Sequence, residues 1–243
     1  MQKDHDINKV IRQHAETEQF FAGFTPKGHP QAQITTDSTD NVSKASDSPA
    51  CLEEIATQVR QCQNCDLGSL RTNAVPGEGN PNARIMFVGE APGADEDAQG
   101  KPFIGRAGKL LDSIIVAMGL KRQDIFIGNI LKCRPPGNRD PRADEIVSCL
   151  PYLQSQIEAI KPEIIIALGA HAAKTLLDTT KPIGQLRGHF HEYYAGLGLP
   201  PIKLMATYHP AYLLRNYSPD NRRRVWEDMK KVLAELDLPV PQR

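Results

Sequence analysis

Short apolar runs, rich in β-branched residues, alternate along most of this chain with longer segments in which apolar residues recur at helical spacing. The short runs have the length of buried parallel strands and span residues 84–88, 124–131, 163–169 and 202–208. The helical pattern occurs near residues 52–59, 110–118, 142–160, 170–177 and 219–236. Strands that alternate with helices form a parallel sheet covered on both faces. The sequence therefore predicts an α/β fold with three layers, α/β/α, around a four-stranded parallel sheet.

Residues 1–50 have a different pattern. Apolar positions between residues 7 and 24, among them Phe20, Phe21 and Phe24, predict one side of a short amphipathic helix. The segment 33–49 is dominated by Thr, Ser, Asp, Asn and Ala, which is a linker composition. We therefore expect residues 1–50 to be a partly helical extension followed by a disordered linker, and residues 51–243 to form the folded domain. Packing of the extension on its own domain is favoured over docking on an unidentified protein partner.

Composition limits the classes of protein to which the chain can belong. Its 243 residues suffice for one α/β domain with an appendage. The net charge is zero, so any basic surface for nucleic acid must be local. No apolar run approaches the ~20 residues of a membrane span, and the first residues lack the apolar core of a signal peptide. We therefore expect a cytoplasmic protein without membrane association, in which grouped cysteines hold a metal rather than form disulfides.

The segment after the first predicted strand, residues 89–105, is rich in glycine and in acidic residues. A glycine-containing loop that joins a strand to a helix is where open α/β sheets bind ligands. A phosphate-binding P-loop would continue with Gly-Lys-Ser or Gly-Lys-Thr, whereas this loop carries Glu90, Asp95, Glu96 and Asp97. The sequence therefore predicts a ligand site here that is not built for a nucleoside triphosphate.

The cysteines have the spacing of a metal site. Cys62 and Cys65 form a C-x-x-C pair ahead of the first strand, and Cys133 and Cys149 can complete a set of four thiolates. Four thiolates suit either structural zinc or an iron–sulfur cluster, and the number of ligands does not separate the two. A thioredoxin-type dithiol is disfavoured because that motif begins a helix inside a βαβ unit. Cys51 remains as a plain thiol.

Polar and aromatic residues follow the predicted strands at the points where those strands end. Glu90 and Asp97 follow the first strand, Asn129 lies at the end of the second, and His209 follows the fourth. Because parallel strands end on the same edge of a sheet, these groups can converge on one pocket. The amide of Asn129 offers one donor group and one acceptor, which match the edge of a pyrimidine lactam. His209 can donate to an oxygen that gains negative charge, and Phe103 can stack on a flat ring.

Basic residues are clustered beside the same edge. Because the chain has no net charge, this clustering predicts phosphate contacts on one face. Leu213 and Leu214 precede a basic residue, and an apolar wedge next to a cation is a device that unstacks a duplex. The candidate phosphate contacts are Lys132, Arg134, Arg139, Arg142, Arg187, Arg215 and Arg222–Arg224.

Several separated motifs together resemble those of the family 4 uracil-DNA glycosylases. They are Gly89–Gly93 with Glu96 and Asp97, Gly100–Phe103, Asn129, Lys132–Pro136 and His209–Ala211. The resemblance covers roughly residues 51–237 and excludes the N-terminal fifty. It implies the four-stranded α/β/α fold of that family and uracil-containing DNA, single- or double-stranded, as the partner. It also implies a [4Fe–4S] cluster, rather than zinc, on the four cysteines. Separately from the resemblance, we expect a monomer.

The resemblance further implies a mechanism and roles for particular residues. Uracil would be flipped out of the stack into the pocket, where Phe103 stacks on it and Asn129 bonds its polar edge. The backbone around Glu90 and Ala91 would bind the uracil carbonyls. His209 would stabilise the uracil anion through O2 as the N-glycosidic bond breaks.

The acidic loop would supply the remaining chemistry. Glu90 is the candidate for positioning the attacking water and stabilising the sugar cation, with Glu96 or Asp97 in support. Leu213 would fill the vacated stack and Arg215 would hold a flanking phosphate. Because no lysine or N-terminal amine is placed as a nucleophile, we expect a monofunctional enzyme that leaves an intact abasic strand.

Three alternatives stay open. One branch of the superfamily bonds covalently to the abasic product through a histidine in a basic insertion after the second strand, but the corresponding segment 132–139 has neither histidine nor insertion. The chain can instead be a binding module that flips uracil without cutting. A zinc-stapled hydrolase acting on a small nucleotide is the third alternative.

Overall fold

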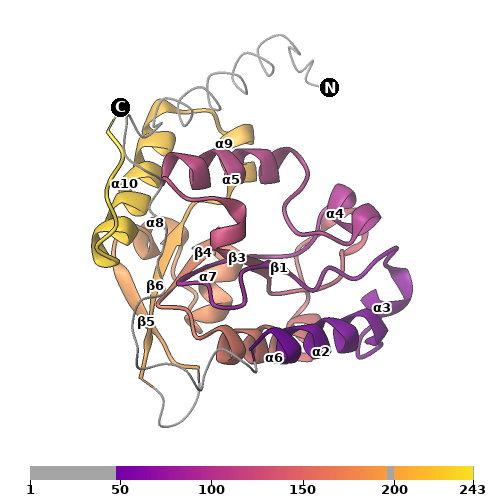
Figure 1. The fold of residues 1–243 in the computed structure, drawn as a ribbon. Helices are drawn as coiled ribbons and strands as arrows, with labels where there is room; N and C mark the ends of the chain where they lie inside the picture. The colour runs from indigo at the N-terminus through magenta and orange to yellow at the C-terminus, as the bar shows by residue number, and fades with distance from the viewer. Residues whose placement is uncertain (1–47, 196–199, 243) are drawn as a thin grey trace, which may run out of the picture.

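The structure of this protein is a computed structural model that describes residues 48–195 and 200–242 (Figure 1). The helix and linker expected within residues 1–47 lie outside the described residues. Helix α2, which begins the described residues, spans Ser48–Gln61 and so starts three residues before the predicted boundary at residue 51. The Ser48 hydroxyl donates to the carbonyl oxygen of Ala159 at 3.0 Å, which ties the start of α2 to the end of helix α6 (Ala143–Ile160).

The central sheet has six strands in the order β1-β3-β2-β4-β6-β5. The four predicted strands form its parallel centre, as β2 (Ile85–Gly89), β3 (Phe126–Asn129), β4 (Ile164–Leu168) and β6 (Ile202–Thr207). The predicted four-stranded parallel sheet is therefore confirmed as the centre of a larger mixed sheet. Two short antiparallel strands, β1 (Glu78–Gly79) and β5 (Phe190–Tyr193), extend its edges. Neither contains the apolar run that reveals a buried strand, because an edge strand is only partly covered.

Helices cover both faces of the sheet, so the predicted three layers are confirmed (Figure 1). Helices α5 (Arg106–Ala117) and α10 (Pro219–Glu235) lie on one face, with the short α9 (Pro210–Arg215) beside α5. Helices α6 and α7 (Ala170–Leu176) lie on the other face, and α2 packs on the outside of α6. The remaining helices are α3 (Leu67–Leu70), α4 (Ala94–Gln99), α8 (Ile183–Leu186) and the 3₁₀ turns η1 (Arg122–Asp124) and η2 (Pro136–Asn138).

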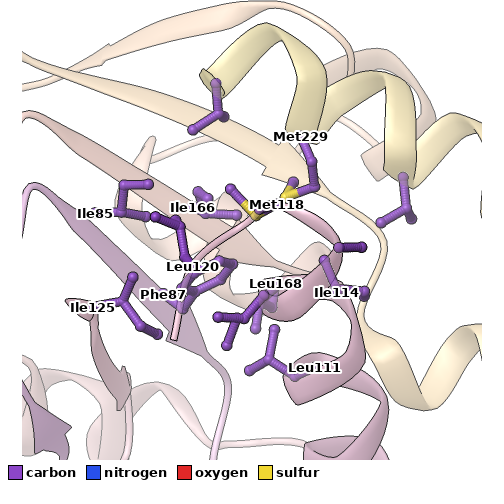
Figure 2. Close-up of a cluster of buried hydrophobic side chains, with 14 of the residues drawn as sticks. Ile85, Phe87, Leu111, Ile114, Met118, Leu120, Ile125, Ile166, Leu168 and Met229 are labelled. Carbon is purple, nitrogen blue, oxygen red and sulfur yellow. The ribbon is translucent and has the colours of Figure 1, made fainter. Parts of the chain in front are cut away.

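Alternation of side chains along β2 builds the two halves of the core. Ile85 and Phe87 pack towards α5 and α10, whereas Met86 and Val88 pack towards α6. Figure 2 shows the first half, in which Phe87 lies among residues of β4, α5 and α10. Because both faces of β2 are buried, its sequence is a continuous apolar run rather than an alternating one.

The parallel centre fixes the place of the functional site. Gly89 at the end of β2 is in register with Asn129 at the end of β3, and β4 and β6 end beside them at Leu168 and Thr207. The segments that follow all four strands therefore leave the sheet at one edge. Among residues 48–195 and 200–242, every helix is too short or too polar to span a lipid bilayer.

Candidate active site

A cavity of about 580 Å³ lies at the carboxyl edge of the sheet. Each of the four parallel strands contributes to its wall: Glu90 follows β2, Asn129 ends β3, Gly169 follows β4 and His209 follows β6. Ala91, Glu96 and Phe103 complete the side formed by the acidic loop. The structure thus brings together the groups that the sequence placed at separate strand ends.

Asn129 presents an unsatisfied acceptor to this cavity. Its side chain is buried, and its Oδ1 atom has no hydrogen-bond partner among the described residues. A buried polar atom without a partner is costly, so its presence in a cavity wall indicates a ligand that donates a hydrogen bond there. Gly89 makes this arrangement possible, because a Cβ at Gly89 would lie 2.4 Å from Asn129 Oδ1 and 2.6 Å from the Phe103 ring.

Phe103 is held beside Asn129 by its backbone. Its φ of +50° is unusual for a bulky residue, and two contacts hold it there. The Arg122 guanidinium donates to the carbonyl oxygens of Pro102 and Phe103. The absence of a side chain at Gly108 lets the Phe103 carbonyl approach α5, since a Cβ at Gly108 would lie 2.0 Å from that oxygen. The Phe103 ring is thereby fixed in the cavity wall, with its centroid 5.6 Å from that of His209.

His209 is a neutral hydrogen-bond donor in the cavity wall beside Phe103. It is the N-cap of α9, and its Nδ1 atom accepts from the Ala211 amide at 3.0 Å. Burial, helped by the positive charge of Arg215, lowers the pKa of His209 to about 4. At neutral pH the ring therefore carries its one proton on Nε2. A neutral imidazole that donates from Nε2 can stabilise an oxygen as that oxygen becomes negative.

Glu90 lies among three other ionisable groups. Burial raises the pKa of Glu90 above the usual carboxyl range, the charges of His171 and Arg215 lower this pKa, and the charge of Asp140 raises it. His171 and Asp140 also line the cavity. Sequence reasoning missed both of them, although His171 follows the end of β4 and obeys the same strand-end rule as Glu90 and His209.

The two supporting acids of the loop have structural contacts. The Glu96 carboxylate lines the cavity but accepts from the backbone amides of Gly93, Ile104 and Gly105 at 3.1, 2.9 and 2.9 Å. Asp97 is buried outside the cavity wall and accepts from the amides of Thr72 and Asn73. The structure thus does not bring Asp97 to the chemistry, and it gives Glu96 the task of joining the two ends of the loop that carries Phe103.

The predicted wedge and the predicted phosphate contact on α9 have different surroundings. Leu213 is 1% exposed and packs in the core cluster that also contains residues of α5 and α10, so it is not available to enter a duplex in this structure. Its neighbour Leu214 is only partly buried. Arg215 is exposed at the cavity rim, where a backbone phosphate can reach it.

Most of the other predicted phosphate contacts are engaged within the protein. Arg187 makes a two-pronged ion pair with the fully buried Asp228, at 2.6 and 3.1 Å. Arg139 lines the cavity but pairs in the same way with the buried Glu145, and Arg134 donates to Asn138 Oδ1 at 2.7 Å. Lys132 is buried, donates to Gln156 at 2.6 Å, and has its pKa lowered to about 8 by burial. The sequence reveals the positive charge of Arg187 and Arg139, but it does not reveal that buried carboxylates, Asp228 and Glu145, pair with them.

The four predicted metal ligands converge on one small cavity. Cys62 and Cys65 come from the segment between α2 and α3, Cys133 follows β3, and Cys149 lies in α6. N–H groups point at the sulfur atoms: Arg71 donates to Cys133 Sγ at 3.1 Å and the Lys132 amide to Cys149 Sγ at 3.2 Å. Four sulfur donors with N–H groups directed at them suit an iron–sulfur cluster or a zinc ion.

Together the fold and the cavity define a protein that binds a planar ring with hydrogen-bonding edges at the carboxyl end of a parallel sheet. Comparison with known proteins narrows this class. Residues 76–230 match the model of the uracil DNA glycosylase superfamily. The type-4 uracil-DNA glycosylase of Saccharolobus solfataricus is 50% identical over 190 residues, which cover 76% of this chain and 86% of the relative. That of Thermotoga maritima is 45% identical over 181 residues, covering 74% and 92%.

A type-5 uracil-DNA glycosylase of Pyrobaculum aerophilum is less similar, with 32% identity over 154 residues that cover 57% of this chain and 66% of the relative. This chain belongs to the uracil DNA glycosylase superfamily and, within it, to the type-4 family.

Proposed function

We propose that this protein is a monomeric, monofunctional uracil-DNA glycosylase, which hydrolyses the N-glycosidic bond of deoxyuridine in DNA and leaves an abasic site. The observation that carries this proposal is the buried Oδ1 atom of Asn129, without a partner among the described residues, beside the ring of Phe103. Uracil offers an N3–H donor to that oxygen and a flat face to that ring. Relatives named type-4 uracil-DNA glycosylases support the same activity.

Binding requires that the base leaves the helix. Flipping costs a few kcal/mol, and less from a single strand or a mismatch. Stacking on Phe103 and hydrogen bonding to Asn129 offset this cost. Arg215 at the rim binds a backbone phosphate that flanks the flipped nucleotide.

Bond cleavage leaves negative charge on uracil and positive character on the sugar. His209 donates from Nε2 to uracil O2, where the charge develops, and its pKa of about 4 keeps it neutral above that pH. The ionised carboxylate of Glu90 faces the sugar, stabilises its positive character and accepts a hydrogen bond from the water that attacks C1′. The water forms the new C1′–O bond and passes a proton to the Glu90 carboxylate, which returns it to solvent. Uracil leaves as an anion with the electron pair of the glycosidic bond and takes up a proton from solvent.

We further propose that Cys62, Cys65, Cys133 and Cys149 hold a [4Fe–4S] cluster. The four sulfur atoms and the N–H groups of Arg71 and Lys132 directed at them support this, as does membership of the type-4 family. The cluster would cross-link the segment before β2, the loop after β3 and helix α6, and so supply folding energy rather than chemistry.

The activity is tested with a labelled oligonucleotide that carries one uracil, single-stranded and then opposite guanine. Half of each sample is heated in alkali before electrophoresis. We expect a break at uracil only after alkali, and a loss of about 100- to 1,000-fold in the single-turnover rate for His209→Leu. Glu90→Gln and Asn129→Asp should also be impaired, whereas Asp144→Asn, an exposed site outside the cavity, serves as the matched control.

Two of the three alternatives, covalent capture and a non-catalytic binding module, give different results in the same assay. A shifted band that survives denaturation would show covalent capture, and binding without any break would show a non-catalytic module. Either outcome would overturn the proposed reaction.

The cluster is tested by iron, sulfide and zinc analysis of the purified protein. We expect four iron and four sulfide per chain and a brown colour. Cys133→Ser should reduce the iron content and the melting temperature together. A colourless, stoichiometrically zinc-loaded protein would refute the cluster.

A further inference from the structure

Three ionisable side chains from separate elements meet at one side of the cavity. They are Glu90 after β2, Asp140 between η2 and α6, and His171 in the first turn of α7. One side-chain ligand atom from each lies within 4.8 Å of the other two. His171 Nε2 is 3.6 Å from Asp140 Oδ1. The group is therefore arranged so that an imidazole faces two carboxylates.

We propose that His171 and Asp140 are positioning residues for Glu90: His171 holds the Glu90 carboxylate ionised and turned into the cavity, and Asp140 in turn anchors His171. The inference rests on the proposed role of Glu90 and extends it to two residues that no motif of the sequence singles out.

The physical reason is the conflict at Glu90 between burial and charge. The cavity wall removes water from the carboxylate, which favours the protonated form that cannot stabilise a sugar cation. A neighbouring positive charge opposes this preference. His171 on α7, in its protonated form, and Arg215 on α9 both act on Glu90 in this direction and lower its pKa against the effect of burial.

Asp140 acts on Glu90 in the opposite direction, because its negative charge repels that of Glu90 and so raises the pKa of Glu90. Arg139 and Glu96 also line the cavity, but Arg139 is paired with Glu145 and Glu96 accepts from three backbone amides. His171 and Asp140, in contrast, can be changed without breaking an ion pair with a buried carboxylate or the Phe103 loop, and Arg215 is left in place because it also faces the DNA phosphate.

His171 and Asp140 shift the pKa of Glu90 in opposite directions, and a purely structural role for the two residues would not produce opposite shifts. We would measure the single-turnover rate of uracil release against pH, with enzyme saturating over a single-stranded substrate. The rate falls at low pH as Glu90 becomes protonated, about tenfold per pH unit below the pKa. His171→Gln should move this fall to higher pH, and Asp140→Asn should move it to lower pH.

Matched controls carry the same substitutions elsewhere. His189→Gln on an exposed residue before β5 and Asp144→Asn on α6 should leave the acid side of the profile unchanged. Because His171 and Asp140 are partly exposed, with side chains 43% and 80% accessible, both shifts should shrink in high salt. Thermal melts of each variant separate lost folding from changed titration.

The outcomes distinguish this inference from the proposed function. Shifts of opposite sign support it. An unmoved acid side in His171→Gln, or movement of both variants in the same direction, would overturn it while leaving the glycosylase intact. If the wild type does not release uracil, the proposed function itself fails. If Glu90→Gln keeps both the rate and the profile, the glycosylase activity stands, but the proposed role of Glu90 fails and this inference fails with it.

Discussion

Gly89→Ala should disable the site through the volume of one added methyl group, although the substitution is the smallest available. A Cβ at this position would lie 2.4 Å from Asn129 Oδ1 and 2.6 Å from the Phe103 ring, whereas ordinary contact begins near 3.4 Å. Asn129 must therefore retreat by about 1 Å and the ring by about 0.8 Å, given those distances. The backbone of Gly89 needs no left-handed conformation, so the methyl group alone causes the change.

The expected losses follow from these displacements. Misplacing a catalytic or binding group by about 1 Å costs on the order of 100-fold in rate. Overpacking a well-filled interior costs about 1–3 kcal/mol, which is several degrees of melting temperature for a domain of this size. We therefore expect a folded enzyme whose single-turnover rate of uracil release is about 100-fold reduced.

The matched control is Gly184→Ala. Gly184 lies in α8, has nothing within 4 Å of an added Cβ, and should keep both rate and stability. The assay is uracil release at saturating enzyme together with a thermal melt of each variant. If Gly89→Ala melts like the wild type and cleaves within threefold of its rate, the close packing of Asn129 and Phe103 around Gly89 is not what fixes the site.

Three further predictions separate buried from exposed roles. Leu213→Ala should cost about 2–5 kcal/mol in urea unfolding because it empties core space, and Leu214→Ala should cost much less; the reverse order would restore the wedge assignment of Leu213. Arg187→Ala should lower the free energy of unfolding by about 3–5 kcal/mol, because it leaves the buried Asp228 without its ion-pair partner. Arg215→Ala should leave stability unchanged. It should instead reduce the salt dependence of DNA binding, measured by fluorescence anisotropy, by about one phosphate contact. The folded-state pKa of His209, about 4, lies below its unfolded value of about 6.5, so the unfolded chain binds the extra proton and stability falls as pH drops from 6.5 to 4, by up to about 3 kcal/mol. The free energy of unfolding of His209→Leu should therefore depend less on pH between 6.5 and 4 than that of the wild type. An equal pH dependence in the two proteins would show that His209 becomes protonated in the folded state within this range.

Apolar runs and strand-end residues made the fold and the centre of the site predictable. A continuous apolar run such as residues 163–169 indicates a strand that is buried on both faces of the sheet. Because parallel strands end at one edge of the sheet, Glu90, Asn129 and His209 could be placed together without knowledge of the loops. The four cysteines were likewise recognisable, because few other roles need grouped thiols in a chain of this kind.

Roles that depend on a partner far away in the sequence were not predictable. Leu213 and Leu214 are equivalent as letters, and only the packing of α9 against the core decides which of them is buried. The charge of Arg187 suggested DNA until Asp228, 41 residues later, was found beneath it. Edge strands β1 and β5 gave no signal because they lack a continuous apolar face.

The positions of Asp97 and Glu96 connect the two sites of the molecule. Arg71 donates to Cys133 Sγ, and the next two residues donate their amides to Asp97 on α4. One residue earlier on the same helix, Glu96 accepts from the loop that holds Phe103 in its unusual backbone conformation. These hydrogen bonds, joined by the backbone between Arg71 and Asn73 and between Glu96 and Asp97, connect the sulfur cavity to the ring-binding wall. We therefore expect Cys133→Ser to weaken uracil binding as well as stability, although Cys133 does not line the active-site cavity.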